Sequence, residues 1–531
     1  MSKEIIYQML PRLWGNIDKN NQPNGSIDEN GCGKFSSIDS ESLEYIKSLG
    51  ATCVWYTGIL RHATACGTHG CVPSSSDWVK GKAGSPYSIT DYYDVNPYLA
   101  DSPENRMDEF RALVQRTHEA GLKVIMDFVP NHVARDYKRF TEASPAPTGM
   151  ASLGQNDDNS VHWSPNNDFF YYPGCALKLP IENQTYMELP AMATGNAYTP
   201  TPGVNDWYDT IKLNYCDTHT ETWEKMLDIV NYWASMGIDG FRCDMVELVP
   251  AEFFKWLISE VKKNYPELIF VAEVYQKDLY SKYIREVGFD LLYDKSGMYD
   301  SVRAIVEKNV NDSGVPVEEW QSAKRITWNW QFLGDLQPYM LNFLENHDEQ
   351  RFASDFFGKS AENSFAALYV SLFFNQASFM IYAGEEIGER GMDHEGFSGV
   401  DGRTSIFDWW APSSLTKIYK FIHGDKSALT ETERKLLAKY RTALTFATKD
   451  QAVRQGTTYD LCYCNYSSDG FNADRHFAFL RGFGDETQLI ACNFSGTDAD
   501  MKICIPEHGE PIPVHVPAMS GTILNLSRQA F

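Results

Sequence analysis

The sequence predicts a parallel (β/α)₈ barrel, the TIM-barrel fold, with an inserted subdomain after the third strand and a C-terminal antiparallel β-sandwich domain. Three observations support this prediction. Short runs that are apolar on both faces alternate with amphipathic stretches, as in a parallel sheet covered by helices. This alternation is interrupted once within the first 450 residues. Beyond residue 450, short runs of alternating apolar and polar residues replace it.

The predicted barrel strands are eight apolar runs. They occupy residues 5–10, 52–56, 123–129, 238–244, 268–274, 289–294, 339–346 and 378–384. Amphipathic patterns at 41–50, 106–121 and 219–237 predict helices between them. The last two patterns end on glycine, the residue that favours the C-terminal cap of a helix.

The interruption predicts an insertion, because residues 133–215 are rich in Asn, Asp, Pro, Tyr and Gly and too long for a simple loop. The catalytic barrel is therefore expected to comprise residues 1–132 and 216–449, with 133–215 as the inserted subdomain. Residues 450–531 are expected to form the β-sandwich domain. Within them, the run 460–466 is predicted to be a strand, with Cys462 and Cys464 on the same face.

Composition limits the partners of the chain. Its 531 residues suggest two or three domains, and 43% hydrophobic with 22% charged residues is typical of a globular protein. A formal net charge of −24 argues against nucleic-acid or anionic-membrane partners. No apolar run reaches the length of a membrane span, and the N-terminus lacks signal-peptide features. We therefore expect a cytoplasmic protein. An exported protein whose signal peptide has been removed would have the same sequence features. The sequence does not specify an oligomeric state.

The eleven cysteines are expected to be reduced thiols. Cys66 and Cys71, near His62 and His69, are the only pair close to metal-ligand spacing. A zinc site usually needs a second Cys or His pair, and none is evident.

Charged residues at the ends of the predicted strands suggest chemistry, because active sites of such barrels lie at the C-terminal strand ends. Arg242 and Asp244 are two positions apart on one strand, so their side chains point the same way. The guanidinium is predicted to lower the pKa of the Asp244 carboxyl, which suits a nucleophile. A buried ion pair that holds the strand is the structural alternative.

Glu273 lies in the apolar run "FVAEVY" at the end of the next strand. Burial is predicted to raise its pKa toward the range of a general acid. Two carboxyl groups whose surroundings separate their pKa values are typical of a double-displacement glycosidase.

Four ordered motifs, "DFVPNH", "GFRCD", "VAE" and "ENHD", resemble the α-amylase family of retaining glycosidases (glycoside hydrolase family 13). The resemblance implies that Asp244 is the nucleophile, Glu273 the general acid/base and Asp348 a binder of sugar hydroxyls that favours the transition state. It also implies a set of substrate-binding residues, namely Tyr87, His132, Arg242, His347 and Arg351. The expected activity is hydrolysis of α-glucosidic bonds, mainly α-1,4, in starch- or glycogen-derived oligosaccharides.

The resemblance implies no cofactor for catalysis, and Asn131 matches a calcium ligand of the family. Three departures put calcium and starch specificity in doubt. Glu247 and Leu248 stand where many α-amylases have Lys and His, and Lys212 stands at a usually acidic position. Because calcium prefers several oxygen ligands including carboxylates, a structural calcium is doubtful.

Three alternatives remain. A transglycosylase would use the same covalent intermediate with a sugar acceptor. A non-catalytic sugar-binding relative is opposed by the intact set of acids. A metal-dependent barrel hydrolase could take ligands from Asp127, His132 and His347, but no close pair of His residues lies on one strand.

Overall fold

Eight parallel strands close into a barrel in the computed structural model, which describes residues 3–17, 20–137, 146–216, 218–311, 314–506 and 509–526. All eight strands lie within the predicted runs. They are β1 (Ile5–Met9), β2 (Cys53–Tyr56), β5 (Lys123–Phe128), β10 (Gly240–Cys243), β11 (Ile269–Ala272), β12 (Leu291–Tyr293), β13 (Met340–Phe343) and β14 (Ser378–Tyr382). β14 pairs with β1 and closes the ring, so the barrel has no open strand edge.

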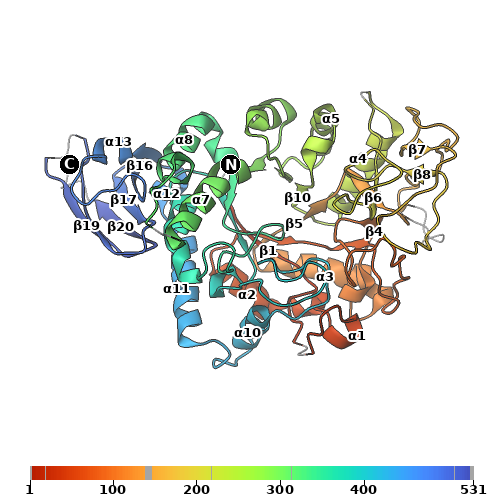
Figure 1. Cartoon of the computed structure of the whole chain (residues 1–531), viewed down its shortest axis with the longest axis horizontal. Coiled ribbons are helices and arrows are strands. Elements are labelled where there is room, and N and C mark those ends of the chain that lie inside the picture. Colours follow the sequence, from red (N-terminus) through yellow and green to blue (C-terminus); the bar gives the residue numbers. More distant parts are fainter. Residues whose placement is uncertain are drawn as a thin grey trace.

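Helices surround the barrel (Figure 1). The main ones are α2 (Ser40–Ser48), α3 (Arg106–Glu119), α4 (Glu221–Ser235), α5 (Ala251–Lys262), α7 (Asp300–Val310), α8 (Lys324–Leu333), α9 (Phe365–Phe373), α10 (Ser413–Ile422) and α11 (Glu431–Lys449). The predicted glycine caps are confirmed: Gly121 and Gly237 follow α3 and α4 with φ of 79° and 90°, a conformation that glycine adopts without strain. Among the residues that the structure describes, no helix is both long and apolar enough to cross a membrane.

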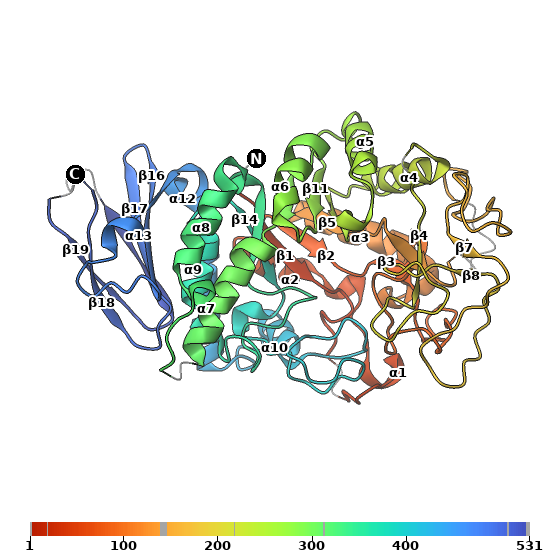
Figure 2. The ribbon, with the colours of Figure 1, turned by 45° about the horizontal axis from the view of Figure 1, so that its top comes forward.

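The segment between β5 and α4 carries small antiparallel sheets. β6 (His132–Ala134) pairs with β9 (Thr210–Lys212), and β7 (Tyr171–Tyr172) pairs with β8 (Ala191–Met192). A small apolar cluster of its own includes Leu177, Leu179 and Tyr186 and takes Trp78 from the loop after β2. This segment lies at one end of the molecule, and the C-terminal strands lie at the other (Figures 1 and 2).

The C-terminal strands form an antiparallel sheet in the order β15 (Thr457–Asp460), β16 (His476–Phe483), β17 (Glu486–Asn493) and β20 (Ser520–Leu526), beside the hairpin β18 (Ala499–Ile503) and β19 (Ile512–Val516). The prediction of a strand at 460–466 is wrong beyond Asp460. The Asp460 carboxylate accepts a hydrogen bond from the Cys462 N–H at 2.7 Å, and the chain turns into the short helix α13 (Cys462–Asn465). The exact domain bounds stay a prediction.

The C-terminal sheet packs on the barrel through aromatic rings. Phe374, just after α9, meets Phe477 and Phe479 of β16 edge to face, with ring centroids 4.8 and 5.0 Å apart. Arg481 is fully buried and donates hydrogen bonds to the carbonyls of Phe373, Val453 and Gly456. These contacts join the sheet to α9 far from the C-terminal ends of the barrel strands.

We expect Phe479→Ala to lower the free energy of unfolding by about 3–5 kcal/mol, because it removes a fully buried ring from this interface. If the folded protein has the activity that the resemblance implies, its kcat/KM should stay unchanged. Denaturant unfolding followed by tryptophan fluorescence measures the first quantity, and Tyr463→Ala, whose side chain is 65% exposed, is the control. A change in kcat/KM without loss of stability would contradict the assignment of a packing role.

Candidate active site

Three of the predicted acids meet in one cavity of about 400 Å³ at the C-terminal ends of the barrel strands. Asp244 follows β10, Glu273 follows β11 and Asp348 follows β13, and all three line the cavity. They share the wall with Tyr87, His132, Trp207, Met245, Tyr275 and Phe407, among others. The barrel therefore brings these three strand-end carboxyl groups together in one cavity.

Arg242 lies beneath these acids and is 1% exposed. Its Nη1 donates to Asp244 Oδ1 at 2.7 Å. Its Nη2 lies 2.9 Å from Glu273 Oε1, an ion-pair distance, although the N–H bonds are not aligned for a hydrogen bond. The rings of Trp55, Tyr87 and Tyr293 surround the guanidinium, with centroids 5.5–5.6 Å away. The Arg242 cation thus pairs with two carboxyl groups in a buried environment.

The pKa prediction for Asp244 is corrected. Burial raises the pKa of its carboxyl, and this outweighs the opposing effect of Arg242. Burial likewise raises the pKa of Glu273, as predicted, with a further upward contribution from the charge of Asp244. The charge of one buried carboxyl group therefore affects the proton affinity of the other.

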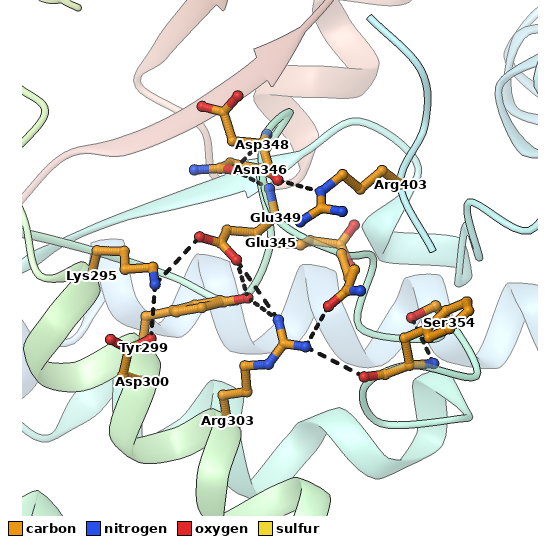
Figure 3. A network of polar contacts seen from close by, with 12 residues as sticks. Lys295, Tyr299, Asp300, Arg303, Glu345, Asn346, Asp348, Glu349, Ser354 and Arg403 are labelled. Atoms are coloured by element: carbon orange, nitrogen blue, oxygen red, sulfur yellow. Dashed lines mark hydrogen bonds and ion pairs between the residues drawn. The ribbon is translucent and has the colours of Figure 1, made fainter. Parts of the chain in front are cut away.

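The loop that carries Asp348 is held by several polar contacts (Figure 3). Asn346 Oδ1 accepts hydrogen bonds from the N–H groups of Asp348 and Glu349, both at 2.8 Å, and Arg403 Nε donates to the Asp348 carbonyl at 2.6 Å. Glu349 in turn forms ion pairs with Lys295 and Arg303. The Asp348 side chain, 41% exposed, is left directed at the cavity, and desolvation and the charges of Glu273 and Asp244 raise its pKa.

The predicted sugar-binding residues differ in their placement. Tyr87 and His132 line the cavity, whereas His347 lies behind Tyr87 and stacks on its ring at 5.4 Å. Its ring nitrogens contact Gln8 Nε2 at 2.7 Å and Tyr87 Oη at 2.5 Å. Burial lowers the pKa of His132 to about 4 and that of His347 well below its usual range, so both are neutral near pH 7.

Arg351 lies apart from the residues that line the cavity in the described part of the chain. It is 1% exposed, pairs with Glu345 at 2.7 Å, donates to Thr404 Oγ1 and lies over the Tyr382 ring. The structure therefore places this arginine in a buried ion pair rather than on the cavity wall where the resemblance put it.

Asn131 contacts the Lys212 amino group, whose pKa burial lowers to about 7. Lys212 Nζ donates to Asn131 Oδ1 and, at 2.8 Å, to the Leu248 carbonyl. Asn131 is the residue that the resemblance matches to a calcium ligand. Asp168, a nearby acid, is paired with Lys225 at 2.7 Å. The residues present do not fit a calcium ion here, because the Lys212 amino group already occupies the space between the two oxygens and supplies no oxygen ligand.

Sequence reasoning missed Tyr275 and Trp207 as cavity residues. The sequence does contain an indication for Tyr275. This residue is two positions after Glu273 in an extended segment, so its side chain faces the same side. No local sequence pattern indicates Trp207 as a cavity residue. It reaches the cavity from the loop before β9, and its ring centroid lies 5.2 Å from that of His132.

The other sequence-level candidate, the thiol pair Cys66 and Cys71, lies outside the cavity. The ring nitrogens of His62 are within 3.0 Å of Asn96 Nδ2 and 2.7 Å of Tyr98 Oη, so this histidine is already engaged. All eleven cysteines are free thiols.

Comparison with known proteins agrees with this geometry. The α-amylase catalytic-domain family matches residues 24–477. A cyclomaltodextrinase of Thermoanaerobacter pseudethanolicus is 24% identical, over 72% of this chain and 57% of its own length. A glucan 1,6-α-glucosidase of Streptococcus dysgalactiae subsp. equisimilis is 24% identical, over 93% of this chain and 91% of its own.

Among solved structures, the debranching enzyme of Nostoc punctiforme, soaked with acarbose, superposes with a TM-score of 0.65 at 19% identity, over 99% of this chain and 98% of that one. The cyclic α-maltosyl-(1→6)-maltose hydrolase of Arthrobacter globiformis gives 0.64 at 17% identity, over 99% and 98%. These two likenesses concern the fold. Because the family match covers most of the sequence and includes all three cavity acids, the chain belongs to the α-amylase family.

Proposed function

We propose that the protein is a retaining glycoside hydrolase that cleaves α-glucosidic bonds, mainly α-1,4, in oligosaccharides derived from starch or glycogen. The observation that supports this most directly is the pair of buried carboxyls, Asp244 and Glu273, served by one guanidinium at the barrel mouth. A double displacement needs a nucleophile and an acid/base whose proton affinities depend on each other. This pair provides both in one cavity.

In the first step, the Asp244 carboxylate attacks the anomeric carbon while Glu273 gives its proton to the departing glycosidic oxygen. The bond to the leaving sugar breaks, and a glycosyl-aspartate forms. Glu273, now ionised, then takes a proton from water, which attacks the same carbon and releases Asp244. Arg242 holds Asp244 through the hydrogen bond of 2.7 Å, and Asp348 is placed to accept hydrogen bonds from the hydroxyls of the distorted sugar.

A transglycosylase is the alternative within the same chemistry, since a sugar hydroxyl can replace water in the second step. The curated relatives include cyclomaltodextrinases and cyclomaltodextrin glucanotransferases, so family membership does not separate the two. A non-catalytic sugar-binding protein would not need three acids in one cavity, and it ranks last.

Retention of configuration is the direct test. We expect the first product released from maltotetraose to carry the α-anomeric hydroxyl, because two inversions at the same carbon restore the original configuration. Proton NMR of fresh product, recorded before mutarotation, distinguishes the anomers. Initial release of the β-anomer would exclude the proposed mechanism.

Asp244→Asn and Glu273→Gln should each lower kcat/KM on maltotetraose by about 10⁴-fold, because each removes one chemical role at nearly constant shape. Circular dichroism and the melting temperature should stay close to those of the parent. Asp108→Asn on α3, whose side chain is 79% exposed, is the matched control. If either cavity variant keeps activity within tenfold of the parent, its assigned role is wrong.

We propose that the protein needs no calcium, because the Lys212 amino group connects the inserted segment with the end of β5 and the loop after β10. EDTA should therefore leave the melting temperature unchanged, whereas Lys212→Met should cost about 1–3 kcal/mol by depriving the buried Asn131 Oδ1 and the part-buried Leu248 carbonyl of this donor. The exposed Lys178→Met is the control. A fall of more than about 3 °C with EDTA, roughly the effect of 3 kcal/mol in a chain of this size, would contradict the proposal.

A further inference from the structure

Glu247 joins two consecutive barrel loops. It lies in the short 3₁₀ helix Val246–Leu248 after β10, and its carboxylate accepts hydrogen bonds from the loop after β11. Oε2 accepts from the Tyr275 N–H at 3.0 Å and Oε1 from the Gln276 N–H at 2.9 Å. Both carboxylate oxygens are thus engaged with backbone donors, and a lysine at this position could accept neither hydrogen bond.

The two joined loops both contact Glu273. The Tyr275 hydroxyl donates to Glu273 Oε1 at 2.7 Å, and the Met245 N–H donates to Oε2 at 2.8 Å. Met245 has φ 45° and ψ 48°, a left-handed conformation that is costly for a residue with a side chain. Such a conformation persists only where neighbouring contacts hold it, and it directs this N–H at the carboxyl.

We propose that Glu247 and Tyr275 are positioning residues for Glu273. Glu247 fixes the loop that carries Tyr275, and the Tyr275 hydroxyl sets the orientation of the acid/base carboxyl. With Arg242 and Tyr275 both at Oε1, that oxygen retains the negative charge and acts as the acceptor. Oε2, which accepts a hydrogen bond from the uncharged Met245 N–H, is then the oxygen that carries the proton to the leaving group. This inference rests on the proposed role of Glu273.

Loss of the Tyr275 hydroxyl should change the pKa of Glu273 in a known direction. A hydrogen bond donated to a carboxylate stabilises its ionised form, so removing it raises the pKa of Glu273. Because bond cleavage uses protonated Glu273, activity on the alkaline side should extend to higher pH. The other charged or titratable groups that face Glu273 are Arg242 on β10, Asp244 just after β10, Tyr293 on β12 and Asp348 after β13, and all are unchanged in the variant.

The test compares two substrates that differ in their need for an acid. Cleavage of maltotetraose requires protonation of a sugar oxygen, whereas α-maltosyl fluoride releases fluoride with little help. The constant to measure is kcat/KM, which reports formation of the glycosyl-enzyme and not its hydrolysis. Tyr275→Phe should lose about tenfold or more on maltotetraose and less than about twofold on the fluoride. Its alkaline limb should move up by about half a pH unit.

Glu247→Ala should show the same selective loss, and Glu247→Gln should recover part of it, since a carboxamide oxygen can still accept one of the two N–H groups. Glu252→Ala on α5 and Tyr232→Phe on α4 are matched controls outside the cavity. Equal losses on both substrates, or no loss on either, would overturn the assignment. If Glu247→Ala alone keeps the kinetics of the parent, Glu247 is not a positioning residue.

A parallel variant separates failure of this inference from failure of the proposed function. In Glu273→Ala, azide should attack the glycosyl-aspartate formed from the fluoride, release Asp244 and yield an α-glycosyl azide. If azide restores no turnover, Glu273 is not the acid/base and the proposed function fails. If azide restores turnover while Tyr275→Phe behaves as the parent, only the positioning roles are wrong.

Discussion

The buried guanidinium of Arg242 is the constraint on which the rest of the site depends. Three carboxyl groups lie around it within 4 Å, at 2.7, 2.9 and 3.9 Å for Asp244, Glu273 and Asp348. Without a cation, burial would keep these acids protonated, and none could serve as a nucleophile. Removing one partner of such a buried pair typically costs about 3–5 kcal/mol, so the arginine contributes to both the fold and the chemistry.

The aromatic rings around Arg242 explain how the cation is tolerated at this depth. Trp55, Tyr87 and Tyr293 present ring faces to the guanidinium from three different segments. In parallel register, Arg242 is level with Asp127 of β5, which also accepts a hydrogen bond from Tyr87 at 3.2 Å. The cavity floor is thus a single network, in which a change at one ring alters the electrostatics of all three acids.

The same kind of contact recurs in the loops. A side chain accepts or donates hydrogen bonds and so fixes the backbone beside a cavity acid. Asn346 and Arg403 do this for Asp348, and Glu247 does it for the loop that carries Tyr275. Lys212 does the same between the inserted segment and the barrel, where the resemblance implied a metal ion. Each contact fixes the backbone of a loop near the C-terminal ends of the strands, where a barrel positions its catalytic groups.

The sequence by itself determined the eight strands, the glycine-capped helices and the three cavity acids. Apolar periodicity and strand-end position are local properties, and residues at strand ends of a closed barrel have only one place to converge. The strand expected at 460–466 failed because a single side-chain hydrogen bond from the Cys462 N–H to Asp460 overrode the alternation of apolar and polar residues. Only the tertiary structure decided the direction of the Asp244 pKa shift, the burial of Arg351 with Glu345 and the contact of Lys212 with Asn131. These depend on desolvation and on partners distant in the sequence, and no local pattern encodes how deeply a charged side chain is buried or which oxygen it meets.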